Sequence, residues 1–335
     1  MKKIIITAII IGSNINLFSQ NNFKNQIFEI GIESIESFRN FLAIKNDANY
    51  KREMEPLIQW GIDSFEEYGF LVEKLETPEL PLLLATKTVS KKANTILIYL
   101  QFDGQPVDNS KWNQEDPYIA VLKQKIDDEY SIVDWNTLDD ISYNEIKKKD
   151  LRIFARSASD AKGPVMMILN ALEIMRRNDI KLKYNIKVIM DFEEELSSPN
   201  LADAVKKYSK KLESDALLIF DGPKHPTNLP TLTFGARGIS DITLITYGPI
   251  VPQHSGHFGN YAPNPVFRMS EIISSMKDNK GRVTIPGFYD GINLDDQTLK
   301  ILAEVPDDEI KMKNEMQFKT PDNVGNNYQE SIQYP

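Results

Sequence analysis

Residues 95–108 read TILIYLQFDGQPVD. The first six form a short apolar run of the kind that becomes a buried strand, and the polar residues Gln101 and Asp103 follow it closely. In open α/β sheets, the loops after the carboxyl ends of the strands line the crevice in which ligands bind. This stretch therefore predicts a buried strand that ends in a functional loop.

Strand and helix patterns alternate along much of the chain. The predicted elements are strands over residues 151–155, 185–190 and 216–220, helices over residues 27–44, 55–75 and 164–177, and a helix start at Ser198 and Pro199. This order predicts an α/β fold in which helices flank a mainly parallel sheet.

The pattern changes after Gly238. Residues 239–247 roughly alternate apolar and polar side chains, a stretch rich in glycine and proline follows, and residues 264–277 have helical spacing. These features predict a second domain of α+β type. Residues 326–335 show no obvious terminal element.

The composition limits the classes of partner. The chain has 335 residues, 41% of them hydrophobic, and a formal net charge of −9. This acidic balance makes nucleic acids and anionic membranes poor candidate partners, and a small molecule or a peptide is a better one. The absence of cysteine excludes disulfides, thiol nucleophiles and thiolate metal sites.

The N-terminus has the pattern of a secretory signal. Lys2 and Lys3 precede an apolar run over residues 4–11, and Ser19 offers a small residue for cleavage. The alternative is a membrane anchor, but the run is much shorter than the roughly 20 residues of a spanning helix. We therefore expect residues 1–19 to be a signal peptide that directs export to the periplasm or secretion, without a stable membrane span.

Four polar clusters follow the four predicted strands. They are Gln101 with Asp103, Ser159 with Asp160, residues 191–195, and Asp221. Because the carboxyl ends of parallel strands meet in one crevice, these side chains are expected to converge. Converging carboxylates repel one another unless they are protonated or bind a cation, so a cation site is expected. For any single cluster the simpler alternative is a solvated loop or a helix cap.

Five stretches resemble the motifs of one enzyme family. Residues 99–108 (YLQFDGQPVD) resemble Gly-His-x-Asp followed by Gln-Pro-Val, and residues 156–163 (RSASDAKG) resemble Arg-Gly-x-Ser-Asp-x-Lys-Gly. Residues 192–201 (FEEELSSPNL) resemble Glu-Glu-Glu-Ile-Gly-Ser-Pro-Asn-Leu, residues 254–259 (HSGHFG) resemble His-Ser-Gly-x-Phe-Gly, and residues 281–290 (GRVTIPGFYD) match a further lid segment. In this order they resemble metallopeptidase family 20, the zinc-dependent exopeptidases of the carnosinase, aminoacylase, succinyl-diaminopimelate desuccinylase and carboxypeptidase G type.

The resemblance implies a role for each acidic residue. Asp160 is expected to bridge two metal ions, with Glu195 completing one side and Asp221 the other. Glu194 is expected to be the general base that takes a proton from a metal-bridging water, and Asp103 is the residue that orients the first ligand.

The resemblance also implies a domain organisation. Residues 20–235 correspond to the N-terminal part of a catalytic domain, and residues 236–335 correspond to an incomplete lid through which family members form homodimers. His254 lies in the lid part and is expected to stabilise the developing oxyanion, in this family often from the partner subunit.

The ligand set departs from the family at Gln101, which stands where the family has a histidine. All four candidate ligands are then oxygen donors: Gln101, Asp160, Glu195 and Asp221. The resemblance implies two zinc ions, whereas oxygen donors favour manganese, magnesium or calcium. The alternative for Gln101 is a polar loop residue without a metal role.

A second departure concerns histidine. The chain has three histidines, His225, His254 and His257, and none of them matches the final metal-binding histidine that the family has near its C-terminus. Ala155 and Ser157 also replace glycines of the family motif around Asp160.

The leading expectation is metal-dependent hydrolysis of a dipeptide-like or N-acyl amino acid amide bond. Two alternatives stay open: a non-catalytic binding protein that keeps the crevice and the lid, and an inactive, truncated gene product that has lost its histidine ligands. The metal content of the purified protein separates an enzyme from a protein that has lost its metals.

Overall fold

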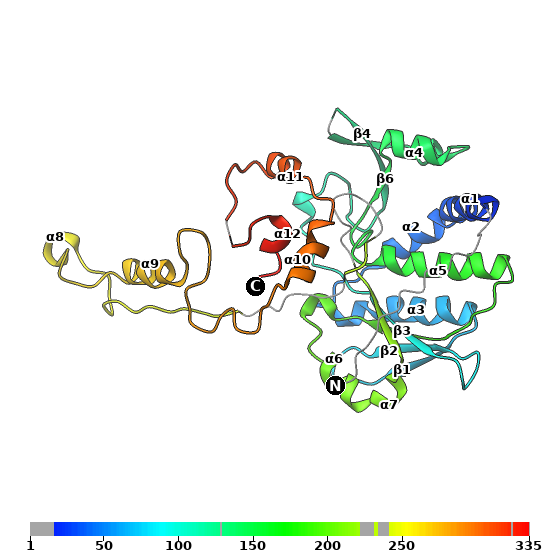
Figure 1. Ribbon diagram of the computed structural model, residues 1–335, viewed down its shortest axis with the longest axis horizontal. Helices are drawn as coiled ribbons and strands as arrows, with labels where there is room; N and C mark the ends of the chain where they lie inside the picture. The colour runs from blue at the N-terminus through cyan, green and yellow to red at the C-terminus, as the bar shows by residue number, and fades with distance from the viewer. Residues whose placement is uncertain (1–16, 128, 222–230, 234–240, 323, 335) are drawn as a thin grey trace. The chain divides into compact units, whose positions relative to one another are not determined.

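A computed structural model describes residues 17–127, 129–221, 231–233, 241–322 and 324–334 (Figure 1). The chain divides into two compact units, Met1–Pro223 and Lys224–Pro335. We describe each unit by itself. Most of the predicted signal peptide lies outside the described residues, and residues 17–19 begin the first helix. No helix in the described ranges is long and apolar enough to cross a membrane.

A mixed five-stranded sheet forms the centre of the first unit. Its strand order is β1-β2-β7-β3-β8, and the strands are β1 Leu71–Leu75, β2 Leu82–Lys87, β3 Thr95–Gln101, β7 Asn185–Asp191 and β8 Ala216–Phe220. Strands β7, β3 and β8 run parallel, whereas β1 and β2 are antiparallel to their neighbours. The predicted strands over residues 185–190 and 216–220 are therefore confirmed in one parallel group with β3.

The register of the parallel strands brings their carboxyl ends together. Gln101 lies opposite Asp191 in β7, and Leu100 lies opposite Phe220 in β8. Because strands that are parallel and in register end at one edge, the loops after β3, β7 and β8 start side by side. This edge carries most of the predicted site.

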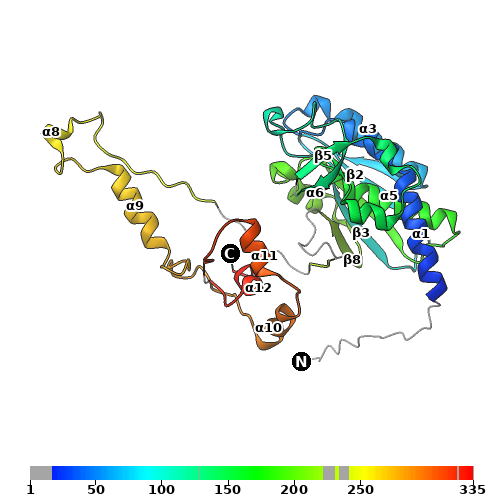
Figure 2. The same ribbon diagram turned by 90° about the horizontal axis from the view of Figure 1, so that it is seen from above.

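Helices cover both faces of this sheet, as an α/β fold requires (Figure 1). The helices of the first unit are α1 Leu17–Glu33, α2 Ile35–Ala43, α3 Glu55–Glu67, α4 Tyr143–Lys149, α5 Lys162–Arg177, α6 Leu201–Lys207 and α7 Ser209–Leu212. Side chains of α2, α3 and α5 pack on one face, on Ile98 and Leu100, whereas side chains of α6 and α7 pack on the other, near Leu97 and Ile189. Helices α1 and α5 lie side by side in both views (Figure 2), joined by an ion pair of 2.6 Å between Glu33 and Arg177.

A second, three-stranded antiparallel sheet corrects one prediction. Its order is β5-β4-β6, with β4 Val121–Ile126, β5 Glu129–Val133 and β6 Arg152–Phe154. The predicted strand over residues 151–155 therefore exists, but it pairs with β4 and is not part of the main sheet. The expectation that four strands of one parallel sheet carry the site is wrong in this respect, because the apolar pattern of β6 does not specify which edge it joins.

Two further predictions differ from the structure near turns. The expected helix over residues 55–75 ends at Glu67, because Gly69 adopts a left-handed φ of +74° that turns the chain into β1. Ser198 is not a helix cap: its hydroxyl donates to Asp191 (2.7 Å), and helix α6 begins after Asn200.

The second unit contains five helices in its described residues, α8 Ser255–Phe258, α9 Pro265–Met276, α10 Asp296–Ala303, α11 Glu309–Glu315 and α12 Tyr328–Ser331. Helix α9 confirms the predicted helix over residues 264–277, and α12 lies where no terminal element was expected. Residues 241–247 pair with no strand within the described part of this unit, where one isolated bridge joins Lys277 and Val283. The β part of the predicted α+β domain is thus not found in these residues.

Lys162 links the start of α5 to the end of α2. Its side chain is fully buried, and Nζ donates hydrogen bonds to the backbone carbonyls of Phe41 (2.9 Å), Leu42 (3.4 Å) and Ile44. The last carbonyls of a helix lack partners within the helix, and a cation there is favoured by the helix dipole. This lysine therefore satisfies a helix end that is otherwise buried.

We predict that Lys162→Met destabilises the protein. The variant leaves buried carbonyls without their donor, and a loss of about 2–4 kcal/mol in the free energy of unfolding is expected. Urea unfolding measures it, and Lys181→Met is the control because that side chain is 84% exposed. Equal urea midpoints for the two variants would show that the carbonyl contacts contribute little.

Candidate metal centre

Two buried carboxylates hold the loop that follows β7. Asp103 accepts hydrogen bonds from the backbone N–H groups of Glu194 (3.1 Å) and Glu195 (3.0 Å). Asp191 accepts from the backbone of Glu193 (3.0 Å) and from the hydroxyl of Tyr99 (3.0 Å). The backbone of this short acidic loop is thus fixed from the ends of both β3 and β7.

The loop also contains two residues with left-handed backbone. Ser197 has φ +66° and Ser198 has φ +45°, and Ser197 stands at the glycine of the family motif. Serine enters this region at a steric disadvantage relative to glycine. The hydrogen bond from Ser198 to Asp191 helps to hold the reversal, which presents Glu194 and Glu195 beyond the sheet edge.

Four of the predicted acidic residues lie within electrostatic range of one another. Burial raises the pKa of Asp160, and the charges of Asp221 and Glu195 raise it further, while the nearby Arg156 lowers it. Burial likewise raises the pKa of Glu194 to about 7, with additional repulsion from Glu195, Asp221 and Asp160. The structure thus brings these carboxylates together even though Asp160 follows a strand of the smaller sheet.

The carboxylates are near one another but are not gathered around a single point. In the described ranges, no three histidine, aspartate or glutamate side chains form a ready-made metal-binding group. The carboxylate of Glu195 instead accepts a hydrogen bond from Nε2 of Gln105. Like charges in a partly buried site repel one another, and a divalent cation relieves that repulsion.

Gln101 is at the position of the missing histidine. It is only 2% exposed, and its Nε2 is buried without a hydrogen-bond partner. A buried amide without a hydrogen-bond partner lowers the stability of the fold by about 1–3 kcal/mol, so this side chain is destabilising where it stands. A carboxamide also offers a carbonyl oxygen, which is a ligand for hard cations and a poor substitute for imidazole on zinc. The residues present therefore fit a cation held by oxygen and do not fit a histidine-based zinc centre.

His254 belongs to the second unit. It is exposed at the start of α8, where its Nδ1 accepts a hydrogen bond from the backbone of Gly256 (3.0 Å) and its ring centroid lies 4.9 Å from that of His257. This is the local hydrogen bond of a glycine-rich loop. Because Nδ1 accepts, Nε2 carries the ring proton and is available as a donor. His225 lies outside the described residues.

Comparison with known proteins gives a family match. Residues 133–318 match the family model described as Peptidase family M20/M25/M40. The human Beta-Ala-His dipeptidase is 24% identical over 278 residues, 78% of this chain and 50% of the relative. The Cys-Gly metallodipeptidase of Candida albicans is 28% identical over 276 residues, 77% of this chain and 52% of the relative. The chain spans about half the length of the curated relatives that it matches.

Solved structures show the same fold. An M20 family metallo-carboxypeptidase from Sulfolobus solfataricus superposes with a TM-score of 0.64 at 24% identity, over 90% of this chain and 62% of the other. Human carnosine dipeptidase 1 superposes with a TM-score of 0.61 at 21% identity, over 92% of this chain and 63% of the other. The predicted α/β fold with helices flanking the sheet is confirmed.

We predict that the metal-free protein loses stability as the pH rises toward 7. Burial raises the pKa of Asp103 from 3.8 to about 7, and the pKa of Glu194 rises from 4.5 to about 7. Between these values the folded state binds more protons than the unfolded chain, so the free energy of unfolding falls as the pH rises toward 7. Above about pH 7 the trend is opposed, because burial lowers the pKa of Lys162 to about 7 and the folded state then binds fewer protons at this lysine than the unfolded chain.

Urea unfolding in the presence of a chelator, at several pH values between about 5 and 8, measures this dependence. Glu194→Gln removes one of the two groups and should flatten the curve, whereas Glu213→Gln, at an exposed position, should leave it unchanged. A stability that rises between about pH 5 and pH 7 would contradict the raised pKa values of the two carboxyl groups.

Proposed function

Because this chain belongs to peptidase family M20/M25/M40, we propose that it hydrolyses the amide bond of a dipeptide-like or N-acyl amino acid substrate with the help of a divalent cation. One observation carries this proposal: Glu194 lies among four other carboxylates, and burial together with their charges raises its pKa to about 7. A general base is most effective when its pKa is near the working pH. The named relatives include dipeptidases for Cys-Gly and Beta-Ala-His, which favours a dipeptide.

Asp160, Glu195 and Asp221 would hold the cation, with the carbonyl oxygen of Gln101 as a fourth donor. When bound, a divalent cation lowers the pKa of water and polarises a substrate carbonyl. Since all of these donors are oxygen, manganese or magnesium suits the set better than zinc.

Glu194 would accept the proton of the attacking water and return it to the leaving amine. Asp103 accepts a hydrogen bond from the backbone N–H of Glu194 (3.1 Å). Asp103 would therefore position the base while the carboxylate of Glu194 stays available for proton transfer. The Nε2–H of His254 would donate to the oxyanion that develops on the substrate, from the partner subunit of a homodimer. An N-terminal signal would direct the protein out of the cytoplasm.

The metal preference can be measured directly. We expect the purified protein to bind Mn²⁺ in a calorimetric titration and to bind Zn²⁺ only weakly in competition, and Gln101→His should strengthen zinc binding by about tenfold or more because imidazole is a preferred zinc ligand. Tight zinc binding by the unchanged chain would contradict the role given to Gln101. A protein that binds no divalent cation would overturn the proposed function and support the non-catalytic alternative.

The assignment of Glu194 and His254 to opposite subunits predicts complementation. Glu194→Ala and His254→Ala should each lower dipeptide hydrolysis by about 10²–10⁴. After subunit exchange, a mixed dimer contains one site with both residues intact, so the mixture should regain part of the activity. No recovery, with exchange demonstrated by differently tagged subunits, would remove the trans role from His254.

A further inference from the structure

Asn46 connects two loops of the candidate metal centre. The residue is fully buried after helix α2, and its Nδ2 donates to the backbone carbonyl of Phe102 (3.0 Å) and to the hydroxyl of Ser157 (2.9 Å). The backbone carbonyl of Asn46 accepts a hydrogen bond from the backbone N–H of Gly104 (2.8 Å). One side chain and its backbone therefore contact both the loop after β3 and the loop after β6.

These loops come from different sheets, so strand pairing alone does not fix the distance between them. The loop after β3 carries Gln101 and Asp103, and the loop after β6 carries Asp160. A second contact, from the Arg156 guanidinium to the carbonyl of Pro106 (3.1 Å), joins them nearer to the surface. The buried contacts of Asn46 are the inner part of this connection.

Ser157 and Gly104 fit one another at the same place. Ser157 has a left-handed φ of +61°, is 4% exposed and replaces a glycine of the family motif. A Cβ built on Gly104 would lie 2.2 Å from the hydroxyl oxygen of Ser157 and 2.9 Å from Nδ2 of Asn46. Position 104 must therefore lack a side chain as long as Ser157 keeps its hydroxyl there.

We propose that Asn46 and Ser157 form a positioning joint for the metal centre, which sets the spacing between Asp160 and the Gln101–Asp103 loop. Through Asp103 the joint also governs Glu194 and Glu195, whose backbone Asp103 holds. Residue 46 precedes the stretch that matches the family model, which begins at residue 133. The consequence for cation binding rests on the proposed function, whereas the coupling of the two loops does not.

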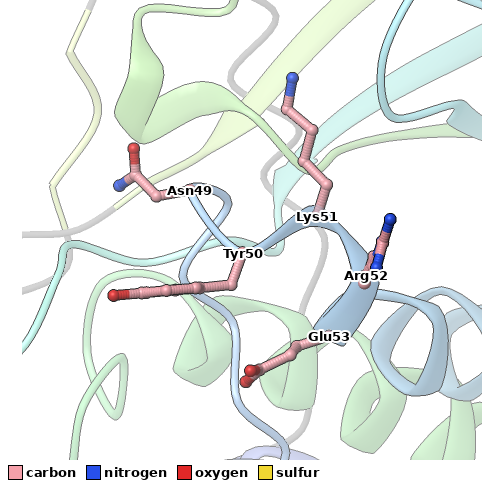
Figure 3. A pocket seen from close by; sticks show the side chains of 5 residues that line it. All are labelled: Asn49, Tyr50, Lys51, Arg52 and Glu53. Carbon is pink, nitrogen blue, oxygen red and sulfur yellow. The ribbon is translucent and has the colours of Figure 1, made fainter.

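The first experiment measures Mn²⁺ affinity by calorimetry. Asn46→Ala should weaken Mn²⁺ binding by about 10–100-fold, the usual effect of removing a residue that orients metal ligands. Asn49→Ala is the matched control, because Asn49 is exposed and lines a surface pocket with Tyr50, Lys51, Arg52 and Glu53 (Figure 3). A folded Asn46→Ala protein with unchanged Mn²⁺ affinity would overturn the proposal.

Ser157→Gly separates positioning from stability. Glycine relieves the left-handed φ, so the melting temperature should stay the same or rise. The same change removes the acceptor of the Asn46 hydrogen bond, so Mn²⁺ affinity should fall. A purely structural role requires stability and affinity to fall together, and that outcome also contradicts the proposal. This variant keeps the test decisive if Asn46→Ala does not fold.

A third measurement does not need a cation. In hydrogen exchange, peptides that cover residues 101–104 and 157–162 should both exchange faster in Asn46→Ala, and Asn49→Ala should match the unchanged protein. Gly104→Ala should lower the melting temperature, and adding Ser157→Gly should restore part of the loss, because it removes the closer clash and leaves the contact of 2.9 Å with Nδ2 of Asn46. If no Mn²⁺ binds, the proposed function fails, and the joint is judged by exchange alone. Unchanged exchange in both peptides would refute it.

Discussion

Parallel pairing of β3 with β7 and β8 places Gln101 beside Asp191 and starts three loops at one edge, and the positions of Asp103, Glu194, Glu195 and Asp221 depend on that register. Apolar side chains of the flanking helices pack on both faces of the sheet, so the loops at this edge carry the polar residues of the candidate site. The hydrogen bonds of Asp103 and Asp191 transmit the strand positions to the loop that bears Glu194 and Glu195.

The buried and the partly exposed carboxylates of this edge serve different purposes. Asp103 and Asp191 are almost completely buried and use their oxygens to hold backbone N–H groups and hydroxyls. Glu194 and Asp160 are more exposed to solvent. Burial is the main cause of the raised pKa of each, and repulsion from neighbouring carboxylates raises it further. One site therefore contains carboxylates that hold the loop backbone and carboxylates that repel one another. A bound cation would relieve that repulsion.

The parts of the fold that sequence predicts well are those with a local pattern. Strands β3, β7 and β8 have apolar runs and helix α5 has helical spacing, so the type and approximate bounds of these elements follow from the local pattern, even though β8 is mostly exposed. Strand β6 has only three residues, and its pairing with β4 is a choice between edges that no local pattern encodes. The end of α3 depends on a single glycine, Gly69, within an otherwise helical pattern.

The acidic residues of the candidate site could also be predicted, because each follows an apolar run and the motif resemblance gave them an order. The role of Asn46 could not be predicted, since an isolated asparagine after a helix resembles any solvated turn residue. Its role arises only from hydrogen bonds to Phe102 and Ser157, which are 56 and 111 positions away along the chain. Ser198 carried a misleading signal: Ser-Pro before an apolar stretch resembles a helix start, but its hydroxyl is used by Asp191.

The contact between Ser157 and position 104 makes the history of this loop depend on the order of substitutions. A lineage with glycine at both positions can accept serine at 157 in one step, whereas a lineage with a side chain at 104 must first lose it. Substitutions at positions 104 and 157 are therefore coupled, and a side chain at position 104 fits this backbone only where Ser157 and Asn46 both move or are replaced.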